Sequence, residues 1–231
     1  SAAARGSRDE VAMDWSAPID AYCERTSADF WVEPLNAVTN AAFFVAAFAA
    51  ILLLRKDARA GRSEWVLVGL IVAIGAGSFL FHTFATRWAA LTDVVPINVF
   101  IYVYFYLALR RLVDLRVSAS LALLALFCAA SLGLAAVVPG GTLNGSVSYA
   151  PAFLAMLAVG GVLLFKESPA ARPVLAAALV FLASLTARTF DHAACGALPV
   201  GLHFIWHVLN AVVLYLLVRT LLIHSPPRRT R

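Results

Sequence analysis

The chain has 231 residues, of which 62% are hydrophobic and only 13% are charged, and its mean hydropathy is +0.85. This composition leaves too few polar residues to cover a soluble protein of this size, so it predicts an integral membrane protein. The formal net charge of +5 does not indicate a nucleic-acid partner, because no run of basic residues interleaves with aromatic residues.

The first 34 residues divide into two parts. Residues 1–13 are small, polar and charged and lack the apolar core of a signal peptide, so a disordered tail is expected there. Residues 14–34 combine aromatic with acidic side chains: Trp15, Tyr22, Phe30, Trp31, Asp14, Asp20, Glu24, Asp29 and Glu33. That composition predicts a folded acidic cap at the outer membrane interface.

Apolar stretches follow that are near the ~20 helical residues needed to cross a bilayer core of ~30 Å. They run over residues 35–54, 65–84, 94–109, 117–137, 148–165, 174–190 and 200–223. They predict one all-α domain over 35–224, an integral membrane bundle of seven transmembrane helices, and a basic tail follows at 225–231.

Basic residues cluster in alternate connections, which predicts how the bundle is oriented. These residues are Arg55, Lys56, Arg59, Arg62, Arg110, Arg111, Arg116, Lys166, Arg172, Arg219, Arg228, Arg229 and Arg231. By the positive-inside rule they are cytoplasmic, so the N-terminus is expected outside and the C-terminus inside. The prevalence of arginine amid abundant alanine favours a multi-pass protein of a bacterial inner membrane.

Polar side chains gather at the expected outer ends of three helices. Asn36, Thr39 and Asn40 lie within about one turn in the first helix, so that end is expected to face something other than lipid. Ser78 and His82 share a face of the second helix, after small residues that allow close backbone approach.

Asp93 is expected at the start of the third helix, with Pro96 in the first turn. It could be a helix cap or a catalytic acid. Ser78 could equally bond its own i−4 carbonyl.

His203 and His207 lie one turn apart near the start of the last apolar segment, where an unsatisfied imidazole is costly. Because the second helix runs outward and the seventh inward, His82 reaches the same depth as this pair. Three imidazoles with one open tetrahedral position are typical of catalytic zinc, which lowers the pKa of a water to ~7.

Other interpretations of these residues stay open at this point. His203 and His207 could form an interhelical hydrogen-bond pair or belong to the interfacial belt, and paired histidines across helices could bind a b-type haem. Arg188 and Asp191 are interpreted as an i, i+3 ion pair at a helix end.

The three cysteines differ in their expected surroundings. Cys128 falls within a helix and is interpreted as a small core residue. Cys23 and Cys195 both map to the outer side, where an oxidising compartment permits a disulfide between them.

Several of these motifs, in this order and spacing, resemble the alkaline ceramidases and their bacterial homologues. This family belongs to a superfamily of seven-helix membrane hydrolases that also includes the progestin and adiponectin receptors. The motifs are Tyr22-Cys23-Glu24, Glu33 with Asn36 and Asn40, Ser78-x-x-x-His82, Asp93, and His203-x-x-x-His207. The resemblance extends over about residues 20–215.

The resemblance implies zinc on His82, His203 and His207, with Ser78 and Asp93 as catalytic residues at the reacting water or carbonyl. It also implies a disulfide between Cys23 and Cys195. A calcium site is implied in the cap on Asp20, Tyr22, Glu24, Thr26 and Glu33. Two departures affect the calcium site: Thr26 stands where the animal enzymes have asparagine, and the family's Asp-Trp-Cys-Glu run is here Asp20-Ala21-Tyr22-Cys23-Glu24.

The expected function is therefore zinc-dependent hydrolysis of the amide bond of a membrane lipid such as ceramide, giving a fatty acid and an amine base. The helices at 117–137 and 148–165 lack ionisable interior residues and are expected to help line an acyl pocket. The alternative is a seven-helix receptor or lipid-binding protein with a structural zinc and no turnover.

Overall fold

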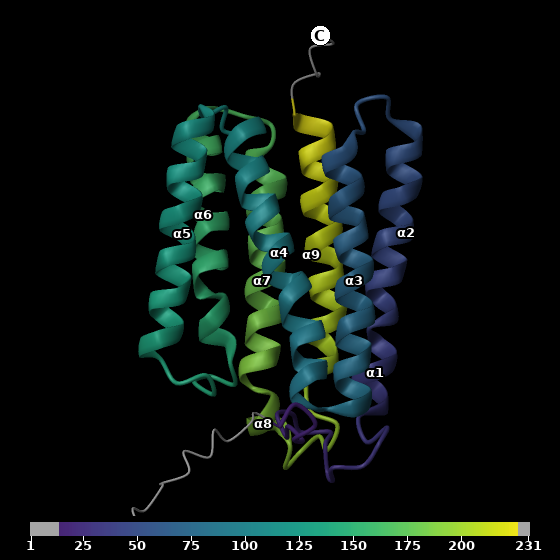
Figure 1. The fold of residues 1–231 in the computed structure, drawn as a ribbon. Helices are drawn as coiled ribbons and strands as arrows, with labels where there is room; N and C mark the ends of the chain where they lie inside the picture. The colour runs from purple at the N-terminus through teal and green to yellow at the C-terminus, as the bar shows by residue number, and fades with distance from the viewer. Residues whose placement is uncertain (1–13, 226–231) are drawn as a thin grey trace, which may run out of the picture.

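A computed structural model describes residues 14–225, and in this part the chain is all-α with seven helices long and apolar enough to cross a membrane. They form one bundle (Figure 1). The expected tail at 1–13 and all but the first residue of the basic tail at 225–231 lie outside the described residues.

The membrane-spanning helices follow the predicted order. The first span is α1 (Pro34–Thr39) continued by α2 (Ala41–Lys56), and the others are α3 (Arg62–Phe84), α4 (Arg87–Arg111), α5 (Val117–Val137), η1 (Ser146–Tyr149) with α6 (Ala150–Phe165), α7 (Ala171–Thr189) and α9 (His203–His224). A short helix, α8 (Asp191–Ala194), precedes α9. Most predicted bounds agree with these to within about three residues.

The third span corrects two predictions. It begins at Arg87, not near 94, so Asp93 lies inside α4 and is not its cap, and Pro96 lies beyond the first turn. The polar residues among 86–93 lower the local hydropathy, so the apolar stretch in the sequence begins about two turns after the helix does. Ala89 and Ala90 are nevertheless good helix formers.

Helix α9 lies in the middle of the bundle and contacts α2, α3, α4 and α7. Helix α5 lies at one side, packs on α4 and α6, and buries only Ser120 and Phe127. Its many exposed leucines and valines suit a lipid-facing surface. The buried apolar core therefore lies around α9, between α2, α3, α4 and α7.

One end of the bundle, called here the cap end, carries residues 14–33, α1 and α8 (Figure 1). The cap is tied to the α3–α4 connection by backbone bonds from Ile19 to Ala85 and from Arg87 to Ala17. A disulfide joins Cys23 to Cys195, as expected. The cap therefore covers the C-terminal end of α3 and the N-terminal end of α9.

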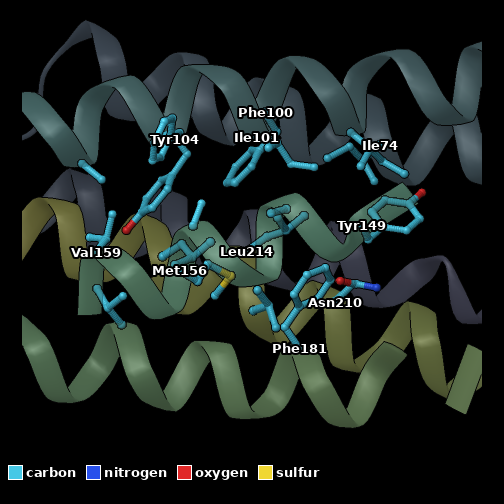
Figure 2. A pocket seen from close by; sticks show the side chains of 18 of the residues that line it. Ile74, Phe100, Ile101, Tyr104, Tyr149, Met156, Val159, Phe181, Asn210 and Leu214 are labelled. Carbon is cyan, nitrogen blue, oxygen red and sulfur yellow. The ribbon is translucent and has the colours of Figure 1, made fainter. Parts of the chain in front are cut away.

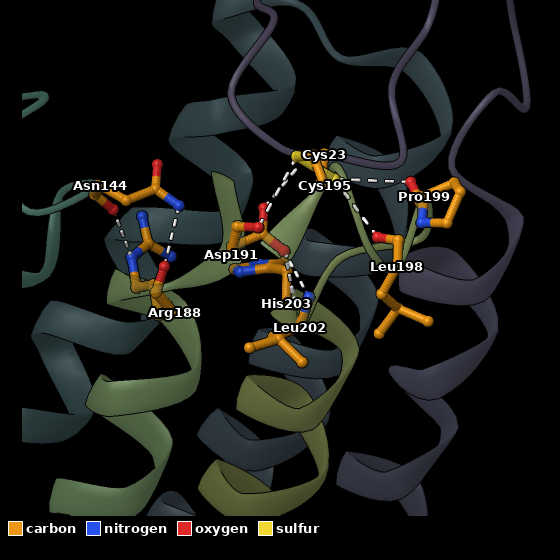
Figure 3. Close-up of a disulfide and its surroundings, with 9 residues drawn as sticks. All are labelled: Cys23, Asn144, Arg188, Asp191, Cys195, Leu198, Pro199, Leu202 and His203. Carbon is orange, nitrogen blue, oxygen red and sulfur yellow. Dashed lines mark hydrogen bonds between the residues drawn. A yellow bond between two sulfur atoms is a disulfide. The ribbon is translucent and has the colours of Figure 1, made fainter. Parts of the chain in front are cut away.

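Asp191 organises the segment before α9 (Figure 3). Its buried carboxylate accepts hydrogen bonds from the backbone N–H groups of Leu202 (2.6 Å), His203 (2.9 Å) and Cys23 (2.9 Å). The predicted ion pair with Arg188 is wrong, because Asp191 is directed at the first N–H groups of α9 and Arg188 at Asn144. Asp191 thus fixes where α9 begins and connects it to the cap.

Helices α3 and α4 pack closely at Gly77. A Cβ atom at this position would overlap the carbonyl oxygen of Thr92, so only glycine allows this separation. The contact places Ser78 and Asp93, the next residue on each helix, at the same depth.

Replacing Gly77 with alanine is expected to force α3 and α4 apart and to lower the Tm by several degrees, because the overlap is with rigid backbone. Gly69→Ala in the same helix is the control, since a Cβ there meets nothing within 4 Å. Thermal unfolding of the purified variants measures both effects, and equal Tm values would contradict the close-packing argument.

Candidate metal centre

Three histidines meet at the cap end of the bundle. His82 from α3 and His203 and His207 from α9 are 0%, 1% and 1% exposed, and each offers one nitrogen within 4.8 Å of the others. The i, i+4 spacing puts His203 and His207 on one face of α9. The structure therefore brings together the three residues predicted as metal ligands.

The tautomer of His82 is fixed by Glu33. His82 Nδ1 lies 2.6 Å from Glu33 Oε2, and a carboxylate can only accept a hydrogen bond, so Nδ1 carries the proton. The lone pair of His82 is consequently on Nε2. This arrangement of a carboxylate behind an imidazole is common at metal ligands.

Thr39 fixes His207 in the same way. The Thr39 hydroxyl donates to the Leu35 carbonyl at 2.8 Å, so its oxygen accepts from His207 Nδ1 at 3.0 Å. The lone pair of His207 is therefore also on Nε2, which faces His82 Nε2 at 3.1 Å. If both imidazoles are neutral, no proton lies between these nitrogens, and an arrangement of this kind is compatible with a bound metal ion.

The separation of the His82 and His207 nitrogens fits one edge of a tetrahedral metal site. Two nitrogens ~2.0 Å from one such ion are roughly 3.3 Å apart, close to the observed 3.1 Å. Axial histidines on opposite sides of a haem iron need a larger separation, so the haem interpretation does not fit. His203 supports the metal interpretation, because its Nδ1 is buried without a hydrogen-bond partner in residues 14–225.

Ser78 and Asp93 lie beside the histidines. Ser78 is buried one turn before His82 on α3, and its hydroxyl interacts with the Asp93 carboxyl group. Asp93 Oδ1 is buried and has no hydrogen-bond partner within the described chain. A buried carboxylate oxygen without a donor leaves an acceptor available to a water or a substrate N–H.

Cap residues complete the wall of the site. The Tyr22 ring stacks on the His203 ring with 3.6 Å between centroids, and burial raises the pKa of the Tyr22 hydroxyl well above its usual value. Burial also opposes ionisation of Glu33, but the hydrogen bonds and charges of His82 and Arg25 hold the pKa of Glu33 below its usual value. The stabilisation from ionised Glu33 is therefore complete at neutral pH and is lost as the pH falls through the lowered pKa.

The residues expected to hold calcium do not gather around one point. Both Glu24 oxygens accept backbone N–H groups at the start of α1, from Leu35 (2.7 Å) and Asn36 (2.8 Å). Glu33 is occupied by Arg25, Asn36 and His82. Asp20 and Thr26 are exposed, and the Tyr22 carbonyl, which is the expected ligand atom of that residue, accepts a hydrogen bond from the Arg25 N–H at 3.1 Å. In this arrangement the set does not fit calcium, which takes six to eight oxygen ligands.

Arg188 is a residue of this region whose position the sequence did not indicate. Its guanidinium lies 5.4, 5.6 and 5.1 Å from the ring centroids of Tyr22, Tyr149 and Trp206, and its Nε donates to the Asn144 carbonyl at 3.0 Å (Figure 3). These cation–π contacts join the cap, η1 and α9. The only signal in the sequence for these cation–π contacts is the presence of the aromatic residues Tyr22, Tyr149 and Trp206.

Comparison with known families agrees with this geometry. The family model described as Ceramidase matches residues 16–226. The chain belongs to the Ceramidase family. No curated protein matches the chain. Membership implies an amidohydrolase with a lipid substrate, and together with the seven helices it indicates a multi-pass membrane protein.

An apolar cavity runs through the interior of this Ceramidase-family protein (Figure 2). Its lining comes from α4, α6, α7 and α9, with single residues from α2, α3, α5 and η1. Tyr149 and Trp206, which contact Arg188, line it near the histidines, and Val159 and Leu217 line the deep part. Of the two helices expected to line an acyl pocket, α6 contributes several residues and α5 contributes only Phe127.

Thr39→Val is expected to weaken metal binding roughly 10–100-fold, because valine cannot accept the hydrogen bond from His207 Nδ1. Thr186→Val is the matched control, since its hydroxyl also bonds an i−4 carbonyl but lies exposed on α7. Competition with a chelator, followed by metal analysis, measures the affinity. Equal affinities in the two variants would contradict the orienting role of Thr39.

Proposed function

We propose that this protein is an intramembrane, zinc-dependent amidohydrolase that cleaves a lipid amide such as ceramide into a fatty acid and an amine base. The observation that carries the proposal is that the Nε2 atoms of His82 and His207 face each other. They lie beside the unpartnered Oδ1 of Asp93 and next to an apolar cavity. The cap end faces outward from a bacterial inner membrane in this proposal, because most of the basic residues lie at the other end.

Zinc suits a site of three neutral imidazoles with room for one more ligand. When bound, it supplies Lewis acidity that lowers the pKa of a water and polarises a carbonyl. The residues that would hold it are His82, His203 and His207, whose buried nitrogens are close enough to share one ion. Glu33 and Thr39 keep two of these imidazoles in the required tautomer.

Asp93 is the proton carrier in the proposed reaction. Its free Oδ1 accepts a proton from the attacking water as the new C–O bond forms at the amide carbon. The same carboxyl group then gives that proton to the leaving nitrogen as the C–N bond breaks, so the carboxylate is regenerated. The Ser78 hydroxyl donates a hydrogen bond to the carbonyl oxygen while negative charge develops there.

The cavity is proposed to hold the acyl chain. From Ile97 to Ala108 its lining follows α4 over 11 residues, which corresponds to a depth of ~17 Å at ~1.5 Å per residue. An extended hydrocarbon advances roughly 1.25 Å per C–C bond of ~1.5 Å. The lining is therefore as long as an extended acyl chain of about 14 carbons.

The proposal is tested with purified protein and a panel of N-acyl lipids that includes ceramides, N-acyl ethanolamines, N-acyl amino acids and an ester analogue. We expect the wild-type protein to release fatty acid and, from the amides, an equal amount of amine. The His207→Ala variant is expected to release neither product. A folded, metal-loaded protein without turnover on the panel would contradict it and favour a receptor or lipid-binding protein with a structural metal.

Asp93→Asn is expected to reduce turnover by ~10² or more, because asparagine cannot accept a proton from water. Metal content and Tm should stay close to those of the wild type, since Asp93 is neither a helix cap nor one of the three nitrogen donors. Rates on one hydrolysed amide, measured beside metal content and Tm, give the comparison. Undiminished turnover would remove Asp93 from the mechanism.

Val159→Phe is expected to shift the preferred acyl chain to a shorter length, because Val159 lines the deep part of the cavity opposite Tyr104 (Figure 2). Val162→Phe on the same helix is the control, since Val162 is exposed to lipid. kcat/KM across saturated chains of increasing length measures the shift. Identical chain-length profiles would place the acyl chain outside this cavity.

A further inference from the structure

The cap contains a buried cation of its own. Arg25 is 6% exposed and lies among the acidic residues of the cap. Its Nε donates to Glu33 Oε1 at 2.6 Å, and Glu33 is 1% exposed. Burying a charged group costs free energy unless an oppositely charged partner is buried beside it. Removing either member of this pair is therefore expected to destabilise the cap.

The remaining contacts of Arg25 are to backbone oxygens. Nη1 donates to the Ser27 carbonyl at 2.9 Å and lies 3.5 Å from the Asp29 carbonyl. Nη2 is buried without a hydrogen-bond partner in the described residues. The guanidinium thus gathers one carboxylate and two carbonyl oxygens, the donor types that a calcium ion would take from a loop.

We propose that the Arg25 guanidinium is the resident cation of the cap and replaces calcium there. It fills the space beside Glu33 and neutralises that carboxylate, so no divalent ion is required to fold residues 22–33. Glu24, whose oxygens bond the first N–H groups of α1, is likewise satisfied without a metal.

Arg25 is also a positioning residue for the histidine site. Glu33 uses Oε1 for Arg25 and Oε2 for His82 Nδ1, so the orientation of its carboxylate depends on both partners. Without the guanidinium, Oε1 of Glu33 has no partner, so the carboxylate is free to rotate and no longer fixes the His82 tautomer. The cation of the cap therefore acts on the metal centre through one carboxylate.

The first test uses the wild-type protein, with calcium chloride and EGTA as the probes. The expected result is no calcium in elemental analysis after dialysis against calcium, and the same Tm in 1 mM calcium and in 1 mM EGTA. Stoichiometric calcium, or a Tm that rises with calcium by mass action, would overturn the proposal. This arm needs no variant and is independent of hydrolysis.

The second test removes the charge. Arg25→Met is expected to lower the Tm by on the order of 10 °C, because Glu33 stays buried while its Oε1 loses its charged partner. It is also expected to change the visible spectrum of the cobalt-loaded histidine site below that Tm. Arg87→Met, at an exposed arginine of the cap end, should change neither. An unaltered Tm and cobalt spectrum in Arg25→Met would overturn the positioning role.

The third test exchanges one cation for the other. Arg25→Glu adds a carboxylate beside Glu33 and the Ser27 and Asp29 carbonyls, which should create a calcium site where the guanidinium was. The expected result is a low Tm in EGTA that calcium raises in this variant and not in Arg25→Met. Absence of calcium rescue in a folded Arg25→Glu would contradict the idea that the guanidinium occupies a cation position.

Discussion

The arrangement of the cap end depends on one constraint, which is that imidazoles shielded from water must have both ring nitrogens satisfied. Glu33 and Thr39 each accept the Nδ1 proton of one histidine and leave two Nε2 lone pairs 3.1 Å apart. A positive charge between the nitrogens would stabilise this arrangement. Glu33 and Thr39, at the two ends of α1, are therefore polar because they accept hydrogen bonds from the histidines of α3 and α9.

The cap contributes structure to the site as well as covering it. Asp191 bonds the first N–H groups of α9 and the Cys23 backbone, while the disulfide joins the same two segments covalently. Arg25 and Glu33 then connect the cap to His82. Each histidine position is thus determined by contacts from a segment distant in sequence, which is how a flexible loop can contribute to a precise metal geometry.

Most of the fold was predictable from the sequence, because apolar length is a direct consequence of bilayer thickness. The start of α4 was not, since Arg87, Thr92 and Asp93 reduce hydropathy where the helix has already begun. The histidine set was predictable from spacing and depth. The partners of Glu33 were not, because a carboxylate in a loop gives no sign of whether arginine, histidine or calcium will neutralise it.

One regularity connects the histidine site to the cavity. On α9, His203, His207, Asn210, Leu214 and Leu217 follow at alternating steps of four and three residues, so they form one stripe. The first two contribute to the metal centre and the last three line the cavity. Facing them on α4, Asp93, Ile97, Phe100, Tyr104 and Ala108 form a similar stripe. Both stripes change from polar to apolar with distance from the cap end. A substrate with a reactive polar group at one end of a long hydrocarbon therefore matches this interior, whereas a compact polar substrate does not.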